Sequence, residues 1–273
     1  MDLFGADSDC EDDAGHPPLP TSRPKENGVM AFHAGTEQAL LVYLRSLAPA
    51  PASPAEVLSE IDTFCIERHW MMHVGSEKAG ILRAALAKAL PGPNPGFALL
   101  ELGTYCGYSS VLLCHTLLEL LPDEQSAGVR VVSLEVDEGH ASVARQVIEM
   151  AGLSDRITVI VERNVEQGLR AAALEERSVD VLFIDHDKDD YKADAQLVLR
   201  QGLLRSGSVV VADNVVMGRI DDYRDWVRAE AGREGGPFLR TELVMSSIEY
   251  SAPDLDLYGA KDMEDGVEIT VLR

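Results

Sequence analysis

Short apolar runs alternate with longer amphipathic segments from residue 97 onward. The runs are FALLELG (97–103), VRVVSLE (129–135), ITVIV (157–161), VDVLFID (179–185) and GSVVVAD (207–213). Each is followed by a segment of roughly 20 residues, which is long enough for the helix of a crossover connection between parallel strands. Because the runs are apolar at nearly every position, both faces of each strand must be covered. The pattern predicts a parallel sheet with helices on both faces.

Two later apolar runs and the upstream segments complete the predicted fold. FLRTELV (238–244) and GVEITVL (266–272) have no helix-length apolar pattern between them, so they predict a final antiparallel hairpin. Upstream, Ser53 and Pro54 are typical of a helix N-cap and first helical position, and helical periodicity returns over residues 76–90. We therefore expect an α/β fold: a Rossmann-like, doubly wound, mostly parallel seven-stranded sheet with an antiparallel C-terminal hairpin and extra N-terminal helices.

The first 30 residues differ in composition from the rest of the chain. Residues 1–30 are rich in Asp and Glu and include the run GHPPLPTSRPKENG. Because they offer little apolar area to bury, they predict a disordered acidic tail, followed by one folded domain over residues 31–273. There is no apolar h-region at the N-terminus, and no stretch approaches the roughly 20 apolar residues of a membrane span. The four cysteines form no CxxC pair and are too few for a disulfide framework. We expect a cytoplasmic monomer.

The charge balance narrows the class of partner. Lys and Arg total 24 against 46 Asp and Glu, which gives a formal net charge of −22. Nucleic-acid phosphates and anionic lipids would be repelled by such a surface, so we expect neither as a partner. A small molecule is the expected ligand.

Acidic residues stand at the ends of four predicted strands. They are Glu101, Glu135, Asp185 and Asp213. In an open parallel sheet, ligands bind outside the carboxyl ends of the strands. A single acid at such a place is commonly a loop carboxylate or a helix N-cap. Four acids on one edge repel one another unless a cation or ligand donors compensate, so we expect a ligand site there.

The turn after the first strand suits a nucleoside without phosphates. ELGTYCGYS (101–109) lacks the GxGxxG spacing that surrounds a pyrophosphate with backbone amides, which disfavours an NAD-dependent dehydrogenase. Gly103 and Gly107 still allow a close approach to the main chain. Glu135 ends the second strand, where an acidic residue accepts hydrogen bonds from ribose hydroxyls in nucleotide-binding folds.

The fourth and fifth strands end in candidate metal ligands. Asp185 begins the string DHDKDDY, and Asp213 and Asn214 follow the fifth strand. Two carboxylates and an amide oxygen are hard ligands that suit Mg²⁺, whose shell water and substrate oxygens would complete. Lys188 follows Asp185 by three residues, about one helical turn, so it can face the same pocket and abstract a proton there. A surface lysine among acids is the alternative reading of Lys188.

Together these strings resemble the catechol O-methyltransferase family. The similarity rests on ELGTYCGYSS, the strand ending at Glu135, IDHDKDDY, ADNVV and SSIEY, with FCIERHWMMHVGSEKAGIL (64–82) upstream and DGVEITVL downstream. It covers roughly residues 55–273. The resemblance implies an enzyme that uses Mg²⁺ and transfers a methyl group from S-adenosylmethionine to a hydroxyl of a catechol-type vicinal diphenol.

The resemblance also implies roles for individual residues. The metal ligands would be Asp185, Asp213 and Asn214. The catalytic residues would be Lys188 as the base, Glu249 on the second hydroxyl, and Asn214. The cofactor would be bound by Val74, Glu101, Gly103, Tyr105, Ser109, Glu135, Val136, Asn164, Asp185 and His186. Trp70 and Met72 would form walls around the sulfonium and the aromatic ring, with ordinary core positions as the alternative.

Three positions depart from the family pattern. Asp187 stands where the family has Trp, and Gly218 stands where it has a Pro that grips the catechol ring. VERNVEQ (161–167) replaces a turn of small residues, and IDHDKDDY also leans toward caffeoyl-CoA-type methyltransferases. The sequence therefore supports the methyl-transfer reaction better than it supports catechol as the substrate. Another vicinal-dihydroxy aromatic substrate and a non-catalytic S-adenosylmethionine-binding relative are the alternatives.

Overall fold

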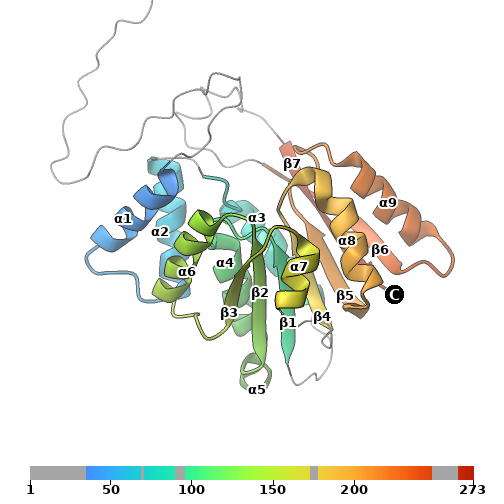
Figure 1. The fold of residues 1–273 in the computed structure, drawn as a ribbon, viewed down its shortest axis with the longest axis horizontal. Coiled ribbons are helices and arrows are strands. Elements are labelled where there is room, and N and C mark those ends of the chain that lie inside the picture. Colours follow the sequence, from blue (N-terminus) through green and yellow to red (C-terminus); the bar gives the residue numbers. More distant parts are fainter. Residues whose placement is uncertain (1–34, 69–70, 90–95, 173–177, 248–263) are drawn as a thin grey trace, which may run out of the picture.

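A seven-stranded mixed sheet forms the centre of the computed structural model, which describes residues 35–68, 71–89, 96–172, 178–247 and 264–273 (Figure 1). The strand order is β3-β2-β1-β4-β5-β7-β6. The strands are β1 (Phe97–Leu102), β2 (Val129–Glu135), β3 (Ile157–Val161), β4 (Val179–Ile184), β5 (Leu204–Ala212), β6 (Phe238–Ser247) and β7 (Glu264–Leu272). The five strands β1 to β5 pair in parallel. The predicted doubly wound fold is confirmed.

Helices cover both faces of this sheet (Figure 1). They are α1 (Thr36–Ser46), α2 (Pro54–Glu67), α3 (Gly75–Ala89), α4 (Tyr108–Leu120), α5 (Asp123–Ser126), α6 (Glu138–Met150), α7 (Val165–Ala171), α8 (Tyr191–Arg200) and α9 (Asp221–Gly232), with the 3₁₀ turn η2 (Lys188–Asp190). Helices α3, α4 and α6 pack on one face, and α7, α8 and α9 pack on the other. The extra N-terminal helices α1 and α2 lie against α6 and α4.

The apolar runs of the sequence form strands buried on both faces, as β4 illustrates. Val181 and Phe183 pack into the layer of α3, α4 and α6, whereas Leu182 and Ile184 pack into the layer of α7, α8 and α9. Successive side chains of a strand point to opposite faces, so a strand covered on both sides must be apolar at every position. Burying each such side chain contributes about 1.5–3 kcal/mol relative to leaving it in water.

The last two strands form the predicted antiparallel hairpin, with β7 inserted between β5 and β6. β7 runs antiparallel to both neighbours, and its Glu268 pairs with Ala212 at the end of β5. Because β7 runs the opposite way, its first residues lie beside the segment that follows β5. Asp265 is thereby brought into contact with Asn214, and Lys78 joins it to Asp213.

The N-terminal helices begin where the sequence indicates. The Ser53 hydroxyl accepts a hydrogen bond from the backbone N–H of Glu56 at 3.2 Å, and Pro54 is the first residue of α2. The acidic segment 1–30 lies outside the described residues. Among the helices of the described part of the chain, none is both long and apolar enough to span a bilayer.

Candidate active site

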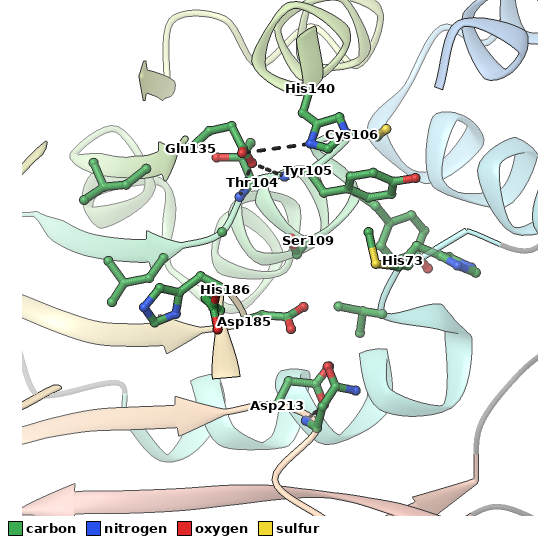
Figure 2. A pocket seen from close by; sticks show the side chains of 18 of the residues that line it. His73, Thr104, Tyr105, Cys106, Ser109, Glu135, His140, Asp185, His186 and Asp213 are labelled. Atoms are coloured by element: carbon green, nitrogen blue, oxygen red, sulfur yellow. Dashed lines mark hydrogen bonds and ion pairs between the residues drawn. The ribbon is translucent and has the colours of Figure 1, made fainter. Parts of the chain in front are cut away.

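A cavity of about 790 Å³ opens at the carboxyl ends of the parallel strands (Figure 2). Its lining includes Gly103, Thr104 and Tyr105 after β1, Glu135 and Val136 at β2, Arg163 and Asn164 after β3, residues 185–188 after β4, and Asp213 and Asn214 after β5. Glu135 and His140 lie at one end and Asp185 and Asp213 at the other, with Ser109 between them (Figure 2). Residues that the sequence separates by more than 100 positions thus share one pocket.

The turn after β1 requires its first glycine. Gly103 has φ +97°, and a Cβ added there would lie 2.3 Å from the carbonyl oxygen of Asp185. Only a residue without a side chain tolerates both conditions. The space beside Gly103 is therefore filled by the protein's own backbone, which packs the first turn against the end of β4.

Glu135 ends β2 with its carboxylate held by four backbone N–H groups. Oε2 accepts from Thr104 at 3.2 Å and Tyr105 at 2.8 Å, and Oε1 accepts from Val136 and Asp137, both at 2.9 Å. The residue is 7% exposed. The carboxylate thus ties the first turn to the end of β2, a role that sequence reasoning missed. Ribose hydroxyls bound here would share its lone pairs with these amides.

Helices α1 and α6 close over the Glu135 end of the cavity. The hydroxyl of Tyr105 donates to Glu37 Oε1 at 3.0 Å, and the Tyr105 ring meets the His140 ring edge to face at 4.9 Å. The His140 ring nitrogens lie 3.8 Å from Glu37 and 4.0 Å from Glu135. Sequence reasoning missed Glu37 and His140, because neither belongs to a motif and only the packing of α1 and α6 brings them here.

Asp185, Asn214 and Lys188 meet at the other end of the cavity. Nζ of Lys188 donates to Asp185 Oδ1 at 2.8 Å, to the Tyr191 hydroxyl at 2.7 Å and to Asn214 Oδ1 at 3.0 Å. Asp213 precedes Asn214 and is 2% exposed. The structure thus brings together the four residues that the sequence assigns to the metal and the base.

The oxygens at this end fit a small, hard cation. A single ammonium nitrogen contacts oxygens of both Asp185 and Asn214, so these two side chains can reach one cationic centre. Burial raises the pKa of Asp213; the Lys78 ammonium opposes this shift, and the charge of Asp185 adds to it. A divalent cation would relieve the repulsion between the two carboxylates. Within the described ranges, no three His, Cys, Asp or Glu side chains group as metal ligands, so the Asn214 amide would have to be the third ligand.

Two buried charges beside this group were missed by sequence reasoning. Nζ of Lys78 in α3 lies 2.7 Å from Asp213 Oδ1 and 2.7 Å from Asp265 Oδ2. Burial disfavours the ammonium, but attraction to Asp213 and Asp265 outweighs it and raises the pKa of Lys78 to about 12. In the sequence Lys78 looks like one polar position of an amphipathic helix, and Asp265 lies in DGVEITVL, which indicates only a strand.

A buried imidazolium supports the wall formed by the segment before α3. His73 Nε2 lies 3.2 Å from Asp62 Oδ1, and His73 Nδ1 lies 3.2 Å from the Met71 carbonyl oxygen. Both partners can only accept, so both ring nitrogens carry protons. Burial disfavours this charge, but hydrogen bonds to Asp62 and Cys65 outweigh it and raise the pKa of His73 to about 10. The hydroxyl of Tyr108 also donates to Asp62, at 3.1 Å.

Most of the residues predicted to bind the cofactor line the cavity. They are Val74, Gly103, Tyr105, Ser109, Glu135, Val136, Asn164, Asp185 and His186. Glu101 is the exception: it is fully buried behind the wall, and the Ser110 hydroxyl donates to it. Burial raises the pKa of Glu101 to about 7. Met72 lines the cavity and is half exposed, whereas Trp70 and Glu249 lie outside the described residues.

Known proteins that are similar to this chain are methyltransferases. Residues 100–215 match a family described as a methyltransferase domain. The chain is 33% identical to catechol O-methyltransferase of Bos taurus over 232 residues, which cover 84% of this chain and 76% of that protein. It is 36% identical to a probable O-methyltransferase of Mycobacterium tuberculosis, over 82% of this chain and 91% of that protein. An O-methyltransferase of Streptomyces achromogenes involved in tomaymycin synthesis, solved with S-adenosylmethionine, shares the fold with a TM-score of 0.56 and 21% identity, over 80% of this chain and 89% of that one.

Proposed function

Because the chain belongs to the catechol O-methyltransferase family of S-adenosylmethionine-dependent O-methyltransferases, we propose that it methylates one hydroxyl of a catechol-type vicinal diphenol with the help of Mg²⁺. The observation that carries this proposal is the position of Lys188 Nζ, 2.8 Å from Asp185 Oδ1 and 3.0 Å from Asn214 Oδ1. This position supports a role for Lys188 as a base beside the oxygens of a proposed cation site. The site lies at one end of a cavity large enough for the cofactor.

S-adenosylmethionine would lie along the cavity, with its ribose at Glu135 and its methionine part toward Ser109 and Asp185. Val136 is 72% exposed at the pocket, and an apolar side chain in this position gains from being covered by the adenine base. Asn164 and His186 would contact the same side of the base. Val74, Gly103 and Tyr105 would line the methionine part, and Glu101 would support this wall from behind.

Methyl transfer asks the protein for alignment rather than covalent chemistry. The substrate oxygen attacks the methyl carbon as the carbon–sulfur bond breaks, so nucleophile, carbon and sulfur must lie in line and water must be kept out. Lys188, in its neutral form, would take the proton of the attacking hydroxyl. Its contacts with Asp185, Asn214 and Tyr191 would hold the amine beside the attacking hydroxyl. Glu249 would accept a hydrogen bond from the neighbouring hydroxyl.

The residues present would hold Mg²⁺ through Asp185, Asp213 and Asn214. When bound, the ion would supply Lewis-acid chemistry, since it would hold two adjacent hydroxyls and lower the pKa of the one that attacks. Three protein oxygens leave half of an octahedral shell for water and substrate. A substrate with a single hydroxyl would offer the ion one oxygen instead of two.

Two positions favour a vicinal-dihydroxy aromatic other than catechol as the second candidate substrate. Asp187 is exposed at the cavity wall, and its carboxylate accepts from the backbone N–H of Asp189 at 3.1 Å. A Cβ added at Gly218 would lie 2.7 Å from the carbonyl oxygen of Asn214. The chain therefore has a carboxylate and a bare backbone where the family places an aromatic ring and a proline. A substrate of the caffeoyl-CoA type, which has binding groups beyond its dihydroxy ring, would depend less on those two walls than a single catechol ring would.

A methyl-transfer screen tests this proposal. The protein is incubated with S-adenosylmethionine labelled in its methyl group and with a series of vicinal diphenols, in buffer with and without Mg²⁺. Transfer to at least one diphenol in the presence of Mg²⁺ is expected. Cofactor binding without transfer to any diphenol would instead identify a non-catalytic S-adenosylmethionine-binding relative.

A further inference from the structure

Asp265 is a buried carboxylate whose partners are residues of the active site. It lies near the start of β7 and is fully buried. Its Oδ2 accepts from Lys78 Nζ and from Asn214 Nδ2, both at 2.7 Å, and its Oδ1 accepts from the backbone N–H of Met217 at 3.0 Å. Three donors from two segments, helix α3 and the loop after β5, therefore converge on one side chain.

The Asn214 amide can take only one orientation between its two partners. On one side Nδ2 of Asn214 donates to the Asp265 carboxylate at 2.7 Å; on the other, Nζ of Lys188 donates to Oδ1 of Asn214 at 3.0 Å. A flipped amide would place oxygen against oxygen and two donors face to face. Asp265 thus decides that the oxygen of Asn214, not its nitrogen, faces the cavity.

The same carboxylate also acts on Asp213 through Lys78. The ammonium bridges Asp213 Oδ1 and Asp265 Oδ2, and the backbone N–H of Asn214 donates to Asp213 Oδ1 at 2.7 Å. One oxygen of Asp213 is therefore occupied by protein donors. The attraction of Lys78 outweighs burial and keeps the pKa of Asp265 below its usual range.

We propose that Asp265 is a positioning residue for the cation: it turns the Asn214 oxygen toward the cavity and, through Lys78, holds Asp213 in place. The proposal rests on the proposed function, since it assumes that Asp185, Asp213 and Asn214 hold a divalent ion. Groups that orient metal ligands typically change metal affinity about 10- to 100-fold when they are replaced.

Metal affinity, rather than turnover, is the measurement that tests this role. Mn²⁺ is titrated into wild type and D265N and followed by the electron paramagnetic resonance of the free ion, with S-adenosylhomocysteine affinity measured by calorimetry on the same samples. D265N should bind Mn²⁺ at least about 10-fold more weakly, with the S-adenosylhomocysteine dissociation constant unchanged within threefold. The matched control is E268Q, because Glu268 lies on the same strand, is also fully buried, and is held by Arg228 at 2.9 Å and Thr241 at 2.8 Å. E268Q should leave Mn²⁺ affinity unchanged.

A second comparison asks whether Asp265 acts through Asn214. In an N214A background, D265N should weaken Mn²⁺ binding by much less than it does in wild type, because the amide that it orients is gone. Equal losses in the two backgrounds, or equal Mn²⁺ affinity for D265N and E268Q, overturn the inference while the proposed cation site stands. A wild type that binds no Mn²⁺ overturns both.

A measurement on wild type keeps the proposal falsifiable if D265N does not fold. The side-chain amide resonances of Asn214 are identified by their loss in N214A, and their hydrogen exchange is followed with and without Mg²⁺. Slow exchange in both states is expected, because Nδ2 donates to a buried carboxylate. Exchange as fast as that of exposed asparagines contradicts the assigned orientation.

Discussion

The Lys188 ammonium lies 2.8 Å from Oδ1 of Asp185, three residues earlier in the chain. Asp185 is therefore both the ion-pair partner of the proposed base and one of the proposed metal ligands. A divalent cation held by Asp185 would compete with the Lys188 amine for this carboxylate. The proposed base and the proposed cation site therefore share one side chain, so filling the site would change the contacts of Lys188.

Replacing Lys188 tests the base directly. Lys188→Ala should lower kcat by roughly 10²-fold or more, the usual contribution of a positioned base, while S-adenosylhomocysteine affinity stays within about threefold. Lys192→Ala is the control, since Lys192 lies four residues on in α8 and its ammonium is 4.0 Å from the exposed carboxylate of Asp222. Steady-state kinetics and calorimetry give the two values. Equal turnover for the two variants would show that Lys188 is not the catalytic base.

Glu135 should matter both for cofactor binding and for the fold. Glu135→Gln replaces one acceptor oxygen by an NH₂ group, which faces backbone N–H groups now held by the carboxylate. Since hydrogen bonds to a charged group contribute about 1.5–3 kcal/mol each, S-adenosylmethionine should bind at least about tenfold more weakly, and Tm should fall. Calorimetry well below the variant's Tm separates the two effects. The control is Glu138→Gln, a change at the exposed first residue of α6, which should alter neither the cofactor affinity nor Tm. An unchanged affinity in Glu135→Gln would exclude Glu135 as the ribose ligand.

The strands could be predicted because their burial on both faces leaves a local signature, as in VDVLFID. Asp185, Lys188, Asp213 and Asn214 could be proposed because they follow such strands directly. The Lys78–Asp265 contact could not, because it joins residues 187 positions apart. It depends on β7 entering the sheet between β5 and β6, and two apolar runs do not specify which of them lies next to β5. The four hydrogen bonds from backbone N–H groups to Glu135 could not be predicted either, because every residue except proline has a backbone N–H.

The buried His73 should make stability depend on pH in a defined direction. Its pKa rises from the ordinary 6.5 to about 10 in the folded protein, so the unfolded chain loses the proton first as pH increases. The stabilisation by His73 is fully present below pH 6.5 and is lost as pH rises toward 10. The free energy of unfolding of wild type, compared with His73→Gln, should therefore fall by about 1 kcal/mol per pH unit across this window. Urea unfolding from pH 6.5 to 9.5 measures this difference, with His115→Gln, a partly exposed site, as control. A difference that does not change with pH contradicts the imidazolium assignment.

The acidic segment 1–30 should be dispensable. Its composition is rich in Asp, Glu, Pro and Gly and offers few large apolar side chains for packing, and the strings that carry the chemistry all lie beyond residue 60. Deletion of residues 1–30 should leave kcat and Tm within error of the full chain. Turnover and calorimetric melting of both proteins check this, and a clear loss of either would place part of the tail in the folded domain.

The metal and the vicinal hydroxyls should be required together, because the hydroxyls would complete the coordination shell of the proposed Mg²⁺. Asp185, Asp213 and Asn214 offer three oxygens, and Mg²⁺ takes six in near-octahedral array. A diphenol can fill two of the remaining positions and a monophenol only one, so a monophenol should be a poor substrate even where it binds. EDTA should abolish methyl transfer, and excess Mg²⁺ should restore it. Asp213→Ala should lower kcat on the order of 10³-fold, more than Lys188→Ala, because water can partly replace a base but not a ligand that places the ion. Asp222→Ala, which removes an exposed carboxylate of α9, should leave the rate unchanged. Full activity in EDTA, or equal rates for a monophenol and its vicinal diphenol, would refute metal-assisted deprotonation as the role of this site.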